Sequence, residues 1–193
     1  MLVAAGVLNT HSGGPGIRPP LLAELVSTLL KKQWEVTENI AGHFRRSIYI
    51  FVRRNLRYPI FEAFDRPAAN SSCPRRNEST TAPQSLLMLN SELSLSKARR
   101  FAAVLLAEAP QGRDEQVELA VRRAFGRLPS KPERDALHRF VASQTALLRE
   151  EGRRAEELAR PIPCPADADP YEAAALTDLC LALFNANEFV YVD

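Results

Sequence analysis

The stretch from residue 130 to residue 148 reads SKPERDALHRFVASQTALL and indicates most clearly how this chain folds. Ser130 is of a type that caps helix N-termini, and Pro132 and Glu133 suit the first turn that follows such a cap. Apolar residues then recur at helical spacing, namely Leu137, Phe140, Val141, Leu147 and Leu148. The sequence therefore predicts a long amphipathic helix here.

The same helical spacing of apolar residues appears on both sides of this stretch. It predicts further helices over about residues 21–32, 83–90, 91–109, 117–125 and 171–184. In the second of these, we expect Leu86, Leu87 and Leu89 to form the apolar face. The fold class that follows is mainly α, an irregular multi-helix domain that also contains a long ordered polar loop.

Residues 45–56 read RRSIYIFVRRNL and fit two structures. Their β-branched and aromatic residues suit a strand, but Ile48, Phe51 and Val52 would also share one face of a helix. No strand with suitable turn chemistry lies nearby to pair with this segment. We therefore interpret it as helix.

Three segments lack a helical pattern. Residues 1–20 are rich in Gly and Pro and predict an irregular N-terminal segment. Residues 61–83 form a polar loop, which is longer than an ordinary connection and which we interpret as packed and functional. Residues 149–170 are charged and then Pro-rich, and we expect the helix to project into solvent or fray there. Residues 1–193 are taken as one α-helical domain.

Composition limits the classes of function. The chain has 193 residues, a formal net charge of +2 and 46% hydrophobic residues, so it can bury a core but carries no strong charge for a nucleic-acid partner. No run of about 18 apolar residues is present, and the first residues lack the pattern of a signal peptide. We therefore expect no nucleic acid, no membrane insertion and no signal peptide in this chain.

The long loop contains the strongest candidate for a binding site, for an anion or a substrate: Asp65, Arg75, Arg76, Ser79, Thr80 and Thr81. Two guanidinium groups can clamp a carboxylate, sulfate or phosphate, and hydroxyls at the start of the next helix could complete the site. The alternative is structural: the arginines pin the loop to nearby carbonyls and carboxylates. We favour this structural role, because irregular loops need polar partners to stay ordered.

Other chemistry is weakly indicated. Cys73, Cys164 and Cys180 allow one disulfide and a free thiol, or three buried thiols, and no Cys-x-x-Cys or zinc spacing is present. We therefore expect no metal and no haem held by this chain alone. Arginines interleaved with aromatic residues over residues 45–58 have the composition of a single-strand nucleic-acid surface, but an amphipathic segment with paired arginines is the interpretation we favour.

Several ordered strings resemble one family. They are GGP (13–15) with PP (19–20), RRSIY (45–49), FEAFDRP (61–67), CPRR (73–76), STTAPQSL (79–86), LN (89–90), AFGR (124–127) with Pro129, and LFNANEFVYVD (183–193). The chain resembles the PSD1, or DUF1553, family of planctomycetes and related bacteria. The family is of unknown function, so the resemblance assigns no catalytic residue.

The resemblance implies a cellular location and neighbouring domains. Proteins of this family look like exported products in which the PSD1 part follows a DUF1549 domain and often a cytochrome c-like domain. We therefore expect a fragment of an extracytoplasmic protein, with haem, if any, in an upstream domain. The implied oxidising compartment predicts a disulfide from Cys73 to Cys164 or Cys180. The predicted function is a non-catalytic interaction or scaffold module; the alternative is part of an enzyme or binding site for an anionic or carbohydrate substrate on residues 65–81.

Overall fold

The computed structural model describes residues 1–21, 34–53, 58–67, 73 and 82–191. The chain divides into two compact units. One consists of Met1–Gly6 and Met88–Asp193 and is called the helical unit, and the other, Val7–Leu87, is called the inserted unit. A single domain over residues 1–193 stays a prediction, because two compact units can belong to one domain or to two.

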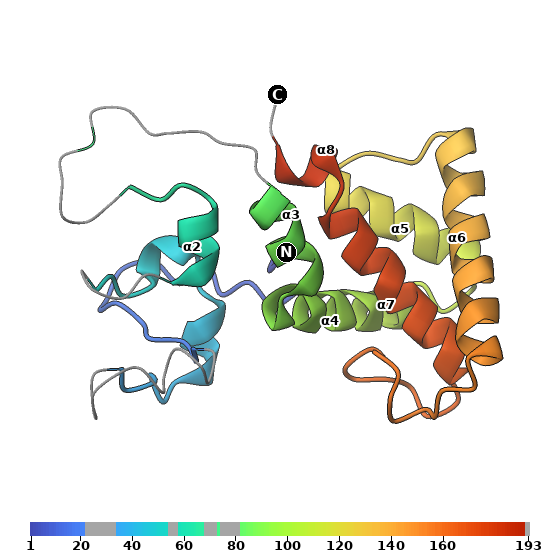
Figure 1. Ribbon diagram of the computed structural model, residues 1–193, viewed down its shortest axis with the longest axis horizontal. Coiled ribbons are helices and arrows are strands. Elements are labelled where there is room, and N and C mark those ends of the chain that lie inside the picture. The colour runs from blue at the N-terminus through green and yellow to red at the C-terminus, as the bar shows by residue number, and fades with distance from the viewer. Residues whose placement is uncertain (22–33, 54–57, 68–72, 74–81, 192–193) are drawn as a thin grey trace. The chain divides into compact units, whose positions relative to one another are not determined.

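Five helices build the helical unit, and the mainly α fold class is confirmed. They are α4 (Glu92–Glu108), α5 (Arg113–Phe125), α6 (Lys131–Glu150), α7 (Pro170–Phe184) and the short α8 (Asn187–Val190). Figure 1 shows α7 running through the middle of the bundle, where it packs against both α4 and α6. Among the described residues, no helix is long and apolar enough to cross a membrane.

The core of the helical unit is centred on α7. The ring of Phe184 stacks on that of Phe101 from α4, with centroids 5.6 Å apart, and both side chains are fully buried. Leu179 and Leu105 are equally inaccessible to solvent. Because α7 is buried on nearly all sides, its sequence is apolar around the whole helix rather than along one stripe.

Helix ends follow the signals in the sequence. The predicted helix of residues 130–148 is α6, and Ser130 and Glu133 form the capping box at its start. The α5 helix stops at Gly126, whose φ of 74° is in the left-handed region that favours glycine. Ser91 caps α4 by accepting a hydrogen bond from the backbone N–H of Ser94 at 3.1 Å. Local capping chemistry therefore sets these boundaries.

The segment after α6 differs from the expected projection into solvent. The helix ends at Glu150, and Gly152 has a φ of 63°, which turns the chain out of the helical path. Leu158 is then buried against Leu148 and Ala174. Arg99 on α4 also donates to the carbonyl of Arg160 at 2.6 Å, so apolar and polar contacts together bring this segment back onto the bundle.

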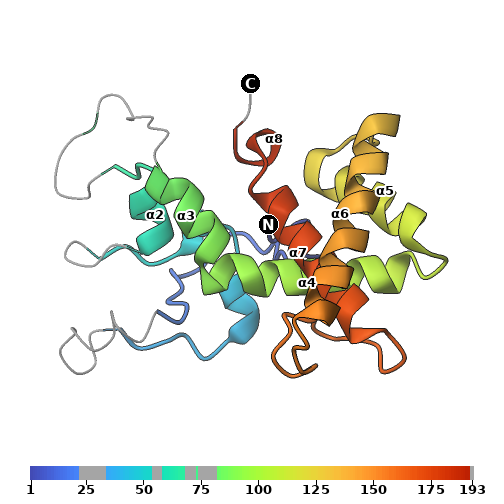
Figure 2. The ribbon, with the colours of Figure 1, turned by 45° about the vertical axis from the view of Figure 1, so that its right-hand side comes forward.

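The inserted unit has short elements. They are the 3₁₀ turns η1 (Ile40–Phe44) and η2 (Ser47–Tyr49), α2 (Pro59–Ala63) and most of α3 (Ala82–Asn90), all visible in Figure 2. On α3 the predicted apolar face is wrong in part: Leu86 and Leu89 are 58% and 50% exposed, whereas Gln84 and Met88 are buried. The helix predicted over residues 21–32 lies outside the described residues.

The helix predicted over residues 45–56 is wrong for the residues that the structure describes. Arg45 and Ile50 form parallel β-bridges with Asn9 and Ile17, and only the 3₁₀ turn η2 lies between them. The backbone N–H of Ile17 donates to the carbonyl of Tyr49 at 2.8 Å, and that of Phe51 donates to the carbonyl of Ile17 at 2.7 Å. The pairing partner lies some thirty residues upstream, so local pattern gave no sign of it.

Candidate functional site

The candidate site on the long loop is described in part. Arg75, Arg76, Ser79, Thr80 and Thr81 lie outside the described residues. Asp65 is half-buried and follows α2 with a φ of 52°, in the left-handed region that Asp tolerates better than most residues. The anion site and its structural alternative both stay predictions.

The three cysteines lie in different surroundings. Cys73 is exposed, Cys164 is half-buried, and Cys180 is buried on α7, where burial raises the pKa of its thiol. Cys164 and Cys180 are not bonded to each other. A buried thiol with a raised pKa is a poor nucleophile, so Cys180 is a packing residue. The disulfide to Cys73 stays a prediction.

Arg45 is buried and holds a loop of the inserted unit from inside. Its guanidinium donates to the backbone carbonyls of His11 at 3.2 Å, Pro15 at 3.4 Å and Gly13. Its plane lies over the ring of Tyr49, with 3.7 Å from Cζ to the ring centroid. We call this arrangement the Arg45 clamp. In this arrangement a buried charged side chain stabilises a Gly-rich loop from inside.

Tyr49 completes the Arg45 clamp. Its hydroxyl accepts a hydrogen bond from the backbone N–H of Gly13 at 3.1 Å. That bond is the main reason why the pKa of Tyr49 lies below its ordinary value, and a bond with the side chain of Ser12 adds to it. The basic stretch of residues 45–58 thus contains at least one arginine whose role is internal.

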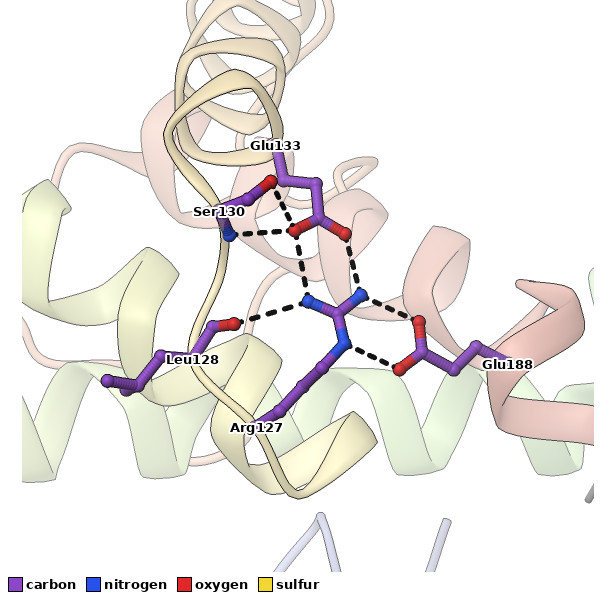
Figure 3. Close-up of polar contacts among 5 residues, drawn as sticks. All are labelled: Arg127, Leu128, Ser130, Glu133 and Glu188. Carbon is purple, nitrogen blue, oxygen red and sulfur yellow. Dashed lines mark hydrogen bonds and ion pairs between the residues drawn. The ribbon is translucent and has the colours of Figure 1, made fainter.

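A second arginine, Arg127, joins three parts of the helical unit (Figure 3). Its Nε and Nη2 donate to the two carboxylate oxygens of Glu188, each at 2.7 Å. Its Nη2 and Nη1 donate to the carboxylate of Glu133 at 2.6 and 3.0 Å. Nη1 also donates to the carbonyl of Leu128 at 3.2 Å. We call these residues, together with Ser130, the Arg127 cluster.

The donors of Arg127 are all engaged. A guanidinium has five N–H groups, and Arg127 makes five contacts, to Glu133, Glu188 and Leu128. The Glu133 carboxylate also accepts from the backbone N–H and the hydroxyl of Ser130, each at 2.7 Å. The site has therefore no donor left for an anionic ligand and acts as a junction between the α5–α6 turn and α8.

The electrostatics of the Arg127 cluster agree with that geometry. The hydrogen bonds from Arg127, followed by those from Ser130, lower the pKa of Glu133 to about 2. Arg127 also lowers the pKa of Glu188, and the two carboxylates raise the pKa of the guanidinium. All three side chains are ionised across the physiological pH range, so the cluster is a permanent ion-pair network.

Buried ionisable groups elsewhere act between helices. Gln144 on α6 donates to the carboxylate of Asp178 on α7 at 2.8 Å, and burial raises the pKa of Asp178. Lys97 on α4 is buried, and that burial, followed by the charge of Arg100, lowers its pKa. His138 Nε2 lies 2.8 Å from Asp114 Oδ1, which satisfies an ion-pair distance but not hydrogen-bond geometry.

No catalytic set is assembled from these groups in the described part of the chain. Lys97, Asp178 and His138 each belong to separate contacts. Searching the described residues for three or more His, Cys, Asp or Glu side chains able to hold a metal ion gives none. The arrangements that the geometry does define are internal junctions made by Arg45 and Arg127.

The fold is that of a mainly α protein, and Arg45 and Arg127 each join separate segments of one unit. The chain belongs to the PSD1 family, whose model, described as a protein of unknown function (DUF1553), matches residues 1–141. No curated protein and no solved structure matches the chain. The match ends inside α6, so α7, α8 and the string of residues 183–193 lie beyond it.

The strings that carried the family resemblance meet in pairs. The Arg45 clamp joins GGP (13–15) to RRSIY (45–49), and Arg127 joins AFGR (124–127) to LFNANEFVYVD (183–193). A third contact joins FEAFDRP (61–67) to STTAPQSL (79–86), because the side chain of Gln84 donates to the carbonyl of Ala63 at 2.8 Å. Sequence reasoning missed these junctions, although the strings themselves were the available signal.

Proposed function

We propose that this chain is a non-catalytic interaction or scaffold module of a multidomain exported protein. One observation carries the proposal: the described part of the inserted unit is poor in core. Among these described residues, the buried apolar side chains are Ile17 and Pro19. Its large exposed apolar side chains are Val36, Ile40, Ile48, Phe51, Val52 and Leu86.

The exposed side chains support an interface because leaving them in water is unfavourable. Ile40 is 68% exposed and Ile48 is 83% exposed. Burying one such side chain contributes about 1.5–3 kcal/mol, which favours association with another surface. The partner that the PSD1 family implies is the upstream DUF1549 and cytochrome c-like part of the same protein. An extracytoplasmic location belongs to the same proposal.

The polar groups support the non-catalytic half of the proposal. Arg45 donates to three backbone carbonyls of the loop at residues 11–15, and all five donors of Arg127 are engaged by side chains and backbone of the helical unit. Catalytic groups need access to a substrate. These two arginines instead give the module a fixed shape, which is what a scaffold requires.

The test is a binding measurement with the upstream part of the encoded protein. We expect calorimetry to detect its association with this chain, and the double change Ile40→Ser with Ile48→Ser to weaken it at least about tenfold, since two buried apolar contacts are lost. The matched control is Leu147→Ser, which removes a 47% exposed apolar side chain from the helical unit. Equal affinity for the double variant and the unchanged chain would overturn the proposal.

The same chain tests the alternative function. Sulfate and an acidic oligosaccharide serve as probes of an anionic or carbohydrate site on residues 65–81. Binding of either probe that disappears on Arg75→Ala and Arg76→Ala, in a chain that keeps its helical content, favours the enzyme or binding-site alternative. Absence of such binding, with association of the upstream part intact, favours the scaffold.

A further inference from the structure

The short helix α8 differs from the helix that precedes it. Nine residues of α7 are buried, whereas α8 buries none. The boundary between them is fixed by Asn185, whose side-chain nitrogen donates to the carbonyls of Leu181 at 2.8 Å and Met88 at 3.5 Å. The chain is therefore anchored up to Asn185, and α8 begins directly after this anchor.

A polar contact and an aromatic contact tie α8 to the rest of the helical unit. The polar contact is the two-pronged pair of Glu188 with Arg127. The aromatic contact places the half-buried ring of Phe189 4.9 Å from the ring of Phe184, which is fully buried. Phe189 thus covers the outer end of the aromatic stack that Phe184 forms with Phe101.

The side of the contact that bears Arg127 is rigid. Arg127 directly follows the left-handed Gly126 that ends α5, and its guanidinium is also held by Glu133 in the first turn of α6. Figure 3 shows the guanidinium between the two carboxylates, with Glu133 on α6 and Glu188 on α8. Loss of Glu188 therefore frees α8 but leaves the α5–α6 turn with its own contacts.

The ion pair that holds α8 and the apolar packing that holds α7 respond differently to salt. The side chains of Arg127 and Glu188 are 40% and 45% exposed. Exposed ion pairs contribute about 0.2–1 kcal/mol and are weakened by salt, although bidentate geometry places this pair toward the upper end. The buried face of α7 is held by many apolar contacts that salt does not weaken. Salt thus weakens the contact that holds α8 but not the apolar packing of α7, whose ion pairs, Arg113 with Glu172 and Arg149 with Asp169, lie at its N-terminal end.

We infer that α8 opens separately from the rest of the helical unit and that the Arg127 cluster holds it in the closed position. Opening breaks the Glu188–Arg127 pair and lifts Phe189 from Phe184, which exposes an aromatic surface at the end of α7. Ionic strength governs the open population, because the pair is the salt-sensitive contact. This property goes beyond the proposed scaffold function and does not depend on it.

Native-state hydrogen exchange on the full chain tests the inference. The amides of Phe189, Val190 and Tyr191 report on α8, since they donate to carbonyls of Ala186 and Asn187. We expect 1 M NaCl to speed their exchange by about 2–5-fold relative to 50 mM NaCl, while amides within α7 keep their rates. Glu188→Gln should give the fast rate at both salt concentrations.

A matched variant separates the effect of the Arg127 cluster from a general effect of removing a charge. Glu157→Gln removes a carboxylate that pairs with Arg154 in the segment between α6 and α7. It should leave the exchange of α8 and its salt response unchanged. The inference is overturned if α8 and α7 exchange with the same free energy and change together, or if Glu188→Gln leaves the rates of α8 as they are.

Discussion

Different interactions stabilise the interior of each of the two units. The helical unit buries a continuous apolar core around α7, with Phe101 and Phe184 stacked at its centre. In the described part of the inserted unit, the buried side chains are two apolar ones, Ile17 and Pro19, and two polar ones, Arg45 and Gln84. Arg45 and Gln84 each capture backbone carbonyls. A core can thus be replaced locally by hydrogen bonds, but stability then depends on few residues.

This difference predicts two kinds of response to mutation. In the helical unit, many apolar contacts contribute to stability. Removal of a buried side chain therefore lowers the free energy of unfolding in proportion to the cavity left behind. In the inserted unit, removal of a polar side chain leaves partly buried backbone carbonyls without donors, which affects the local structure first. The four changes below test the contrast, from the largest expected effect to the smallest.

Phe184→Ala should have the largest effect. It removes a fully buried ring that contacts Phe101 and Phe189, and such changes lower the free energy of unfolding by about 3–5 kcal/mol. Urea unfolding followed by circular dichroism measures it. Leu147→Ala, at a 47% exposed position on α6, is the control and should change stability by less than about 0.5 kcal/mol. A loss below about 1 kcal/mol for Phe184→Ala contradicts the central role of α7.

Arg45→Met should come next, with a loss of about 2–4 kcal/mol confined to the inserted unit. The thioether side chain keeps bulk but offers no donor to the carbonyls of His11, Gly13 and Pro15. Limited proteolysis should therefore cut within residues 9–17 much faster, while urea unfolding of the helical unit stays the same. The change Arg66→Met is the control, because Arg66 is exposed and lies over the ring of Phe61, not at the Arg45 clamp. Equal protection in both variants would show that the Arg45 clamp does not hold this loop.

Gln84→Ala should cost about 1–2 kcal/mol in the inserted unit. The change removes the donor to the carbonyl of Ala63 from a side chain that is 3% exposed. Hydrogen exchange of the amides in α2 measures the local loss. Gln116→Ala removes a similar contact, at 3.2 Å to the carbonyl of Ala109, from a half-buried position in the helical unit and should cost less. A larger loss of stability for Gln116→Ala than for Gln84→Ala would contradict the contrast between the units.

Asp178→Asn should have the smallest effect and the opposite sign. Burial raises the pKa of Asp178 above its ordinary value of 3.8, so the ionised carboxylate destabilises the folded state once the pH exceeds the raised pKa. The asparagine keeps a hydrogen-bond partner for Gln144 without the charge. We expect a higher urea midpoint for the variant at pH 7 and a difference that closes as the pH falls towards 3.8. A pH-independent difference would assign the effect to packing instead.

Local sequence patterns predicted the helical unit well. The capping residues Ser130 and Glu133 and the apolar period that follows them located α6, and Pro129 and Gly126 located the break before it. Such signals are local in sequence, because a helix satisfies its own backbone groups within four residues. The mainly α class followed from patterns of this kind, whereas the PSD1 family followed from the resemblance of ordered sequence strings.

The inserted unit could not be predicted in the same way. The segment from Arg45 to Phe51 pairs with residues 9–17, and no periodicity within either segment reveals the other. The junction of Arg127 with Glu188 spans 61 residues and depends on where α7 ends. The leucines of α3 suggested an apolar face, but tertiary contacts bury Gln84 instead. Long-range polar contacts decide these points, and they leave no periodic trace in a single sequence.

The membership of Met1–Gly6 in the helical unit affects how this protein can be made and divided. Ala4 and Ala5 are buried, and the carbonyl of Ala4 accepts a hydrogen bond from Arg123 at 3.5 Å, so these residues wait during synthesis for partners more than a hundred positions later. An expression product starting at Met88 would lack these two alanines and expose the surface they cover. Excising Val7–Leu87 and joining Gly6 to Met88 with a flexible linker would keep both parts of the helical unit.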